Sequence, residues 1–137
     1  MLSGLFQNTT IPVLEQVVNF SQARHNVLAG NIANVDTPGY KARDLSVEDF
    51  QSRLTAAIQQ RSRPSTGRSP GEPAMQDELL LARVADNSRT ILRHDKAKVG
   101  MEHQVTEMVK NQMQHNLALT VMTSQFRLLQ AAISERV

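Results

Sequence analysis

A row of apolar residues near the start of the chain follows three- and four-residue steps, the spacing of one face of an α-helix. Ser21 and His25 hold two places in the same row. The apolar members of the row are Leu14, Val17, Val18, Leu28, Ile32 and Val35. This pattern predicts one long helix from Ile11 to Val35.

Both ends of this first helix carry recognisable signals. Pro12 fits the first helical turn, where a missing N–H costs nothing, and Thr9 or Thr10 can act as the N-cap. The residue before a proline is pushed towards extended backbone, and Pro-Gly is a strong turn pair. The helix must therefore end before Thr37-Pro38-Gly39-Tyr40, with Asn34 as a natural exit residue.

A second, shorter helix is expected after this turn. The segment Ser46-Val47-Glu48-Asp49 resembles a capping box, with Asp in place of the usual Glu. The apolar residues of the segment that follows share one stripe, which consists of Val47, Phe50, Leu54 and Ile58. The stripe predicts a helix that runs to about Gln60.

The middle of the chain gives weaker signals. Between Arg61 and Ala74, prolines and glycines recur among serines and arginines, which indicates a linker or mobile loop. Its arginines make it locally basic; such a loop is usually just solvated, and the alternative is a docking site for an acidic partner. The apolar residues from Asp77 to Asp95 fit either one broken helix or a short helix and a strand.

The last segment holds the most informative pattern, a strict four-three spacing over about 33 residues without Gly or Pro inside. The seam consists of Met101, Val105, Met108, Gln112, His115, Leu119, Met122, Phe126, Leu129 and Ile133. A second stripe beside it contains Val109, Met113, Leu117, Val121, Leu128 and Ala132. A helix of roughly 50 Å is longer than a domain of this size can cover, so we expect part of its surface to contact other chains.

These segments predict a mainly all-α fold in which long N-terminal and C-terminal helices form a coiled-coil hairpin. We expect Leu14, Val18, Leu28 and Ile32 to face Leu119, Met122, Phe126 and Leu129, and these residues with Ile133 to form an assembly interface. The chain divides into residues 1–42 with the first helix and turn, 43–98 with the short helix, the Pro/Gly-rich loop and a variable middle, and 99–137 with the heptad helix. Its 137 residues suit a single domain.

Composition removes several classes of function. Fifteen Lys and Arg against thirteen Asp and Glu leave a net charge of +2, too small and too evenly mixed to indicate a nucleic-acid partner. The chain has no cysteine, which excludes disulfides and thiolate sites. No apolar run approaches the roughly 20 residues that span a bilayer, so direct membrane insertion is not expected. Residues 1–10 lack the basic start and apolar stretch of a secretory signal.

Candidate chemistry is sparse. His103 and Glu107 are four residues apart, a spacing found in metal sites but too common to indicate one without a motif such as HExxH. His115 in the seam is better interpreted as a hydrogen-bonded interface residue. No serine stands in a nucleophile elbow, and the glycines form no phosphate loop. We therefore expect no catalytic, cofactor-binding or metal-binding residues, no cofactor and no enzymatic activity.

One compact block remains after these exclusions. It consists of Asn31, Ala33, Asn34, Thr37, Pro38, Gly39, Tyr40 and Lys41. Read physically, the asparagines can bond the frayed backbone groups at the helix end, and Tyr40 can cover the turn that Pro-Gly enforces. The block also resembles the signature of the bacterial flagellar axial proteins, the rod and hook family, which places it between an N-terminal helix and a long C-terminal heptad helix.

Within that family the chain is most similar to the short subunits of the proximal rod. The similarity rests on the tract Arg93-His94-Asp95-x-x-x-Val99-x-Met101-Glu102 and on Asn111, Phe126, Leu129 and Ile133. It covers about 45 residues at each end. The chain departs from the family pattern at Lys96-Ala97, where Gly-Asn is usual, at Gly100, where Asp is usual, and at His115, where Tyr is usual.

The resemblance implies a structural subunit without a cofactor. Such a subunit would leave the cell through the flagellar type III export channel and polymerise in the periplasm into the helical rod that transmits torque from motor to hook. The implied partners are copies of itself, other flagellar rod proteins, the MS-ring adaptor and the export gate. Two alternatives stay open: another short rod subunit of the same family, of the C or F type, and a cytoplasmic helical adaptor or export chaperone.

Overall fold

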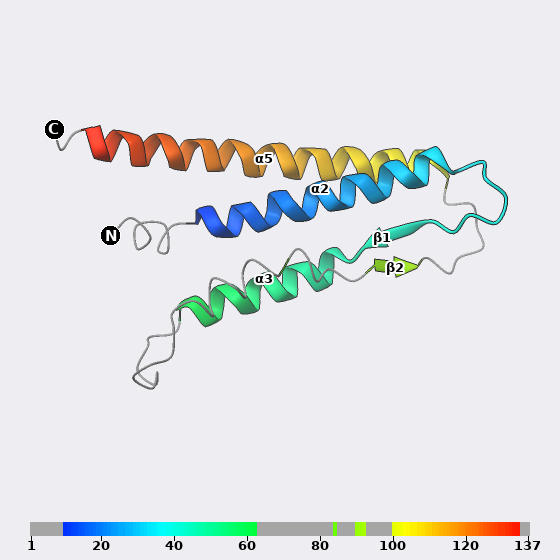
Figure 1. The fold of residues 1–137 in the computed structure, drawn as a ribbon, viewed down its shortest axis with the longest axis horizontal. Helices are drawn as coiled ribbons and strands as arrows, with labels where there is room; N and C mark the ends of the chain where they lie inside the picture. Colours follow the sequence, from blue (N-terminus) through cyan, green and yellow to red (C-terminus); the bar gives the residue numbers. More distant parts are fainter. Residues whose placement is uncertain (1–9, 63–83, 85–89, 93–99, 135–137) are drawn as a thin grey trace.

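The computed structural model describes residues 10–62, 84, 90–92 and 100–134. Its elements in chain order are α2 (Ile11–Ala33), β1 (Arg43–Leu45), α3 (Val47–Ser62), β2 (Thr90–Leu92) and α5 (Met101–Ser134). Helices α2 and α5 lie side by side and run antiparallel, while β1 and α3 lie on the other side of α2 (Figure 1). The mainly all-α class with long N-terminal and C-terminal helices is confirmed, and a two-stranded sheet adds to it.

Helix α2 begins and ends where its sequence signals predict, within two residues. Thr10 occupies the N-cap position, although its side chain makes no capping hydrogen bond, and proline stands in the first turn. Asn34 is the C-cap, so the helix ends two residues before the predicted Val35. The turn signal after the helix therefore sets the boundary more sharply than the apolar row does.

Helix α3 also follows its prediction. The Ser46 hydroxyl oxygen accepts a hydrogen bond from the Asp49 backbone N–H at 3.1 Å, as an N-cap should. The carboxylate of Asp49 pairs with Arg53 at 3.0 Å, four residues on. The helix ends at Ser62, two residues beyond the predicted Gln60.

A small apolar core joins α3 and β1 to α2. Its buried members are Phe20, Leu45, Phe50 and Val84. The rings of Phe20 and Phe50 stack with centroids 4.0 Å apart and planes within 9°. This core lies on the side of α2 that faces away from α5, so α2 is enclosed between two packing partners (Figure 1).

The two strands pair antiparallel, with Arg43 opposite Leu92 and Leu45 opposite Thr90. The apolar pattern did not predict β1, because three residues are too short to show an alternation. Strand β2 agrees with the strand in one of the two interpretations of Asp77 to Asp95; the rest of that segment, apart from Val84, lies outside the described residues. Nearly all of the predicted loop from Arg61 to Ala74 also lies outside them.

Helix α5 has the predicted length, 34 residues, and its last turns extend past the first described turn of α2 (Figure 1). Its rotation differs from the prediction. The face turned inward buries Gln104, Asn111 and Ala118, one residue before Val105, Gln112 and Leu119 of the predicted seam. Met108, Met122 and Leu129 of that seam are half-buried. Leu119 and Phe126 remain 40% and 47% exposed.

The expected pairing of the hairpin is therefore wrong in two respects. Cross-helix hydrogen bonds place Asn31 beside Gln104, so Leu28 and Ile32 lie near the start of α5 and far from Leu119–Leu129. Leu119 and Phe126 are also not buried in the hairpin, as their exposed fractions of 40% and 47% show. The inward face of α5 instead carries polar contacts with α2, which an apolar pattern does not register.

We expect the stacked phenylalanines to hold α3 to the hairpin. Replacing the buried ring, Phe50→Ala, should lower the free energy of unfolding of the α3 region by about 3–5 kcal/mol, because it removes apolar contact and leaves a cavity. Amide hydrogen exchange of α3 measures this effect. The matched control is Ile58→Ala, at a half-exposed position of the same helix; equal exchange rates in the two variants would contradict the assignment.

Candidate functional site

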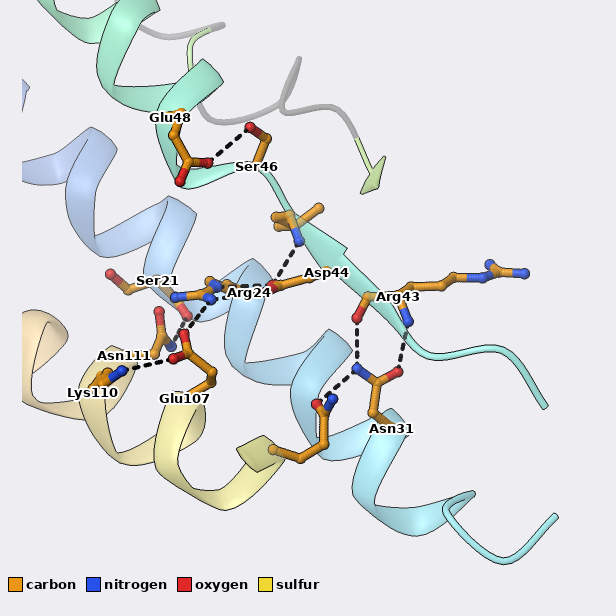
Figure 2. Close-up of polar contacts among 12 residues, drawn as sticks. Ser21, Arg24, Asn31, Arg43, Asp44, Ser46, Glu48, Glu107, Lys110 and Asn111 are labelled. Carbon is orange, nitrogen blue, oxygen red and sulfur yellow. Dashed lines mark hydrogen bonds and ion pairs between the residues drawn. The ribbon is translucent and has the colours of Figure 1, made fainter. Parts of the chain in front are cut away.

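Asn31 is the first residue of the block that ends at Lys41 and is almost fully buried. Its Nδ2 donates to the Arg43 backbone carbonyl at 2.6 Å and to Gln104 Oε1 at 3.1 Å. Its Oδ1 accepts from the Arg43 backbone N–H and from the Tyr40 hydroxyl, both at 3.1 Å. A carboxamide has two donors and two acceptor positions, so all four are used. Asn31 thereby joins α2, the turn, β1 and α5, and Figure 2 shows its two hydrogen bonds with Arg43 of β1.

The turn after α2 has the geometry that Pro-Gly predicts. The Tyr40 N–H donates to the Thr37 carbonyl at 3.2 Å, which closes a four-residue turn. Gly39 has φ +78°, the left-handed conformation that the third residue of a type II turn requires. The turn brings the Tyr40 hydroxyl back to Asn31.

Asn34 ends the helix through its backbone and its side chain. Its Nδ2 donates to the Gly30 carbonyl at 2.8 Å, and its backbone N–H bonds the same carbonyl at 3.2 Å. The Thr37 hydroxyl donates to Asn34 Oδ1 at 3.4 Å. Carbonyls that the helix leaves unpaired at its C-terminus are satisfied in this way.

A cluster of charged side chains joins α2, β1 and α5 two helical turns before Asn31. Arg24 is buried in α2 and donates through Nε and Nη2 to the two carboxylate oxygens of Asp44, each at 2.9 Å. Its Nη2 also donates to Glu107 Oε2 in α5 at 2.9 Å. Lys110 pairs with the other oxygen of Glu107 at 2.9 Å (Figure 2). Bidentate pairing of this kind fixes orientation as well as charge.

The pKa directions follow from these contacts. The hydrogen bond to Asp44 contributes most to raising the pKa of Arg24, against the opposing effect of burial. The hydrogen bond from Lys110 contributes most to lowering the pKa of Glu107 below its ordinary value of 4.5; burial opposes this and Arg24 adds to it. Both groups are therefore held in their charged forms at neutral pH.

A third contact crosses the hairpin. Asn111 is the most deeply buried polar residue of α5 and donates through Nδ2 to the Ser21 backbone carbonyl of α2 at 2.7 Å. Its Oδ1 has no hydrogen-bond partner among the residues that the structure describes. The hairpin therefore carries a buried polar seam, which we define as Ser21, Arg24, Asn31, Gln104, Glu107 and Asn111.

The structure brings most of the block together at the end of α2, far along the hairpin from the expected assembly residues of α5. Ala33, Pro38 and Lys41 are exposed and contribute no side-chain contact that the structure records. Among the expected interface residues, Leu28 is buried, while Leu14, Val18, Ile32, Met122 and Leu129 are half-buried. Leu119, Phe126 and Ile133 are exposed.

Sequence reasoning missed Arg24, Asp44 and Gln104 and gave Glu107 only a weak metal interpretation. Arg24 and Gln104 are polar residues at positions that the structure buries, but no pattern in a single sequence identifies their partners, which lie 20 or more residues away. Glu107 instead forms ion pairs. Within residues 10–62, 84, 90–92 and 100–134, no group of three or more potential metal ligands gathers.

Helix α5 exposes many large apolar residues along its length. The exposed large apolar residues of this helix are Met101, Val105, Val109, Met113, Leu117, Leu119, Val121, Phe126, Leu128 and Ile133. Large contiguous apolar surfaces on a chain mark sites of contact with other molecules. None of the described helices has the length and apolar character that crossing a membrane requires.

Comparisons with known proteins point in one direction. A family model described as flagella basal body rod protein matches residues 19–41, which contain Arg24, Asn31 and the turn. The flagellar basal body rod protein FlgB of Salmonella typhimurium is 32% identical over 127 residues, 82% of this chain and 84% of that protein. The FlgB of Escherichia coli K12 is 31% identical over 82% of this chain and 84% of its own length. The FlgB of Bacillus subtilis is 25% identical over 98% and 96%.

Because Gly39 has a left-handed backbone conformation, a residue with a side chain at this position should destabilise the turn. Gly39→Val should lower the free energy of unfolding by about 1–3 kcal/mol, because a β-branched residue is strained at positive φ. Gly30→Val is a matched control, since an added Cβ meets nothing within 4 Å at either position and Gly30 has no positive φ. Urea unfolding followed by circular dichroism compares the variants, and equal midpoints would contradict the turn assignment.

The lowered pKa of Glu107 predicts the sign of a pH effect. A carboxylate whose pKa is lower in the folded state adds stability above its ordinary pKa of 4.5, and that stability disappears as the pH falls through the folded-state value. Glu107→Gln should therefore reduce the loss of stability between pH 7 and about pH 3.5. Urea midpoints at the two pH values measure it. Glu102→Gln, at an exposed position of α5, should keep the full pH dependence; a similar reduction there would overturn the prediction.

Proposed function

Because the chain belongs to the FlgB family of flagellar basal body rod proteins, we propose that it polymerises through the exposed surface of α5 into the helical rod that carries torque from motor to hook. The chain is a structural subunit of the proximal rod in the basal body. Membership of a rod family also implies association with other rod components.

The observation that carries the polymerisation proposal is the apolar exterior of α5. Leu117, Leu128 and Ile133 are all more than 60% exposed, and Arg127 is the one ionisable residue between Gln112 and Ser134 apart from His115. Burying such a surface against neighbouring subunits would remove it from water, at about 25 cal/mol per Å² of apolar area. Assembly would thus supply burial that the single chain lacks.

The assembly residues expected from the sequence divide into two groups under this proposal. Leu119, Phe126 and Ile133 are exposed on α5 and would contact neighbouring subunits directly. Met122 and Leu129 are half-buried on the same helix, and Leu14, Val18 and Ile32 are half-buried on α2, so each would offer only part of its side chain to a neighbour. Leu28 is buried inside the subunit and would act by supporting the hairpin.

Torque transmission requires a subunit that keeps its shape under load. The contacts of Asn31 and Arg24 join the hairpin to β1, and the stacked rings of Phe20 and Phe50 join α2 to α3. A load applied to α5 would therefore reach the rest of the subunit through directional contacts. Subunits related head to tail would repeat this arrangement in an open helical array.

Two finer parts of the proposal rest on family resemblance. We place the export route in the flagellar type III system, and the partners at the proximal end in the MS-ring adaptor and the export gate. The domain division into residues 1–42, 43–98 and 99–137 would separate two assembly helices from a middle segment. Copies of the chain and other rod proteins would be the distal partners.

A negative charge among the apolar residues near the C-terminal end of α5 should block assembly. Phe126→Asp, and separately Leu129→Asp, should abolish rod formation while the chain is still exported, because an unpaired carboxylate is costly in a packed helix interface. The readouts are swimming of the complemented deletion strain and detection of the exported chain. Thr120→Asp places the same charge on an exposed polar position of α5 and should leave swimming intact.

Electron microscopy of envelopes from the deletion strain tests the function itself. Basal bodies that stop before the rod, restored by the intact chain, are expected. Intact rods and filaments without the chain would reject the structural role and favour a helical adaptor or chaperone. Normal swimming of both Asp variants would reject the α5 interface alone.

A further inference from the structure

The inward face of α5 is not the face that its apolar pattern favours. The heptad row through Val105, Leu119 and Phe126 is exposed, while the row one residue earlier, through Gln104, Asn111 and Ala118, is buried against α2. The second row of the heptad pattern, Met108, His115, Met122 and Leu129, stays half-buried. The helix is therefore turned by only part of the ~100° that separates consecutive residues, and it is the row of Val105 that is displaced outward. A hairpin governed by apolar burial alone would choose the other rotation.

Three polar contacts cross from α2 to α5 and all of them require the observed rotation. They are Asn31 to Gln104, Arg24 to Glu107, and the Ser21 carbonyl to Asn111 (Figure 2). We propose that this buried polar seam is a specificity determinant: it selects the rotation of α5 and thereby keeps the apolar row of Val105, Leu119 and Phe126 facing outward.

The balance of free energies supports a role in specificity more than in stability. Buried polar pairs add little net stability compared with apolar residues of the same shape, but they exclude arrangements in which they would be unpaired. Asn111 keeps an acceptor without a partner in the described part of the chain, a cost that an apolar residue would avoid. A single buried asparagine fixes register in coiled coils in the same manner.

The geometry permits a clean removal of the seam from the α5 side. Without Glu107, Arg24 keeps its bidentate pairing with Asp44. Without Gln104, the Asn31 Nδ2 keeps the Arg43 carbonyl. The Ser21 carbonyl stays within the hydrogen-bond ladder of α2. The triple variant Gln104→Met, Glu107→Met, Asn111→Leu therefore leaves each α2 group with a partner.

Thiol reactivity reports the rotation, because the chain contains no cysteine of its own. Single cysteines are introduced by Ala118→Cys or Leu119→Cys, at positions 4% and 40% exposed. In the otherwise unaltered chain we expect the thiol at position 119 to react faster by about tenfold or more, since a buried site reacts only after local opening. In the triple variant the order of the two rates should reverse.

A matched control adds a similar amount of apolar surface to α5 without changing any residue of the buried polar seam. Thr106→Met, Gln112→Leu and Asn116→Leu change three exposed positions of α5 and should keep the original order of rates. An unchanged order in the triple variant would overturn the proposal and assign the rotation to apolar packing.

The single variant Asn111→Leu provides the second measurement if the triple variant does not fold. It removes one of the three contacts. The reaction rate of the thiol at position 119 divided by that at position 118 should therefore fall but stay above one. A ratio equal to that of the unaltered chain would overturn the proposal. None of these outcomes depends on rod assembly, so the inference stands or fails independently of the proposed function.

Discussion

The carboxamide of Asn31 is the interaction on which the arrangement of this subunit depends. A buried polar side chain is costly unless its hydrogen-bonding capacity is met, and here β1, the turn and α5 together meet all of it. Because the partners come from three separate elements, full pairing turns a potential cost into a geometric constraint. Arg24 imposes the same kind of constraint with full charges, through Asp44 on one side and Glu107 on the other.

Apolar periodicity and turn residues in the sequence were sufficient to predict the parts of the fold that depend on local interactions. The long helices follow from apolar spacing, the end of α2 from the Pro-Gly signal, and the start of α3 from Ser46. The positive φ of Gly39 follows from the type of turn that Pro38 begins. Each of these features is decided within a few residues, where one sequence carries enough information.

The parts that the sequence did not predict depend on contacts between distant residues. Nothing near Arg24 in the chain indicates Asp44 as its partner, and a three-residue strand such as β1 is too short for an alternating pattern. The rotation of α5 is the clearest case. A heptad pattern assumes that the most apolar row is the buried row, and this assumption fails where buried polar groups on the neighbouring helix require partners.

This inversion suits a subunit that must both keep its own shape and join a polymer. Apolar contact is strong but not directional, so a helix with apolar rows on several faces has no single preferred neighbour. Directional polar contacts inside the hairpin determine which row of α5 side chains packs against α2. The remaining apolar rows of α5 stay available for contact with other chains. If the inner row were the apolar one, the hairpin would compete with assembly for the same residues. A polar interior seam and an apolar exterior therefore belong to one design, in which specificity within the subunit preserves the surface used between subunits.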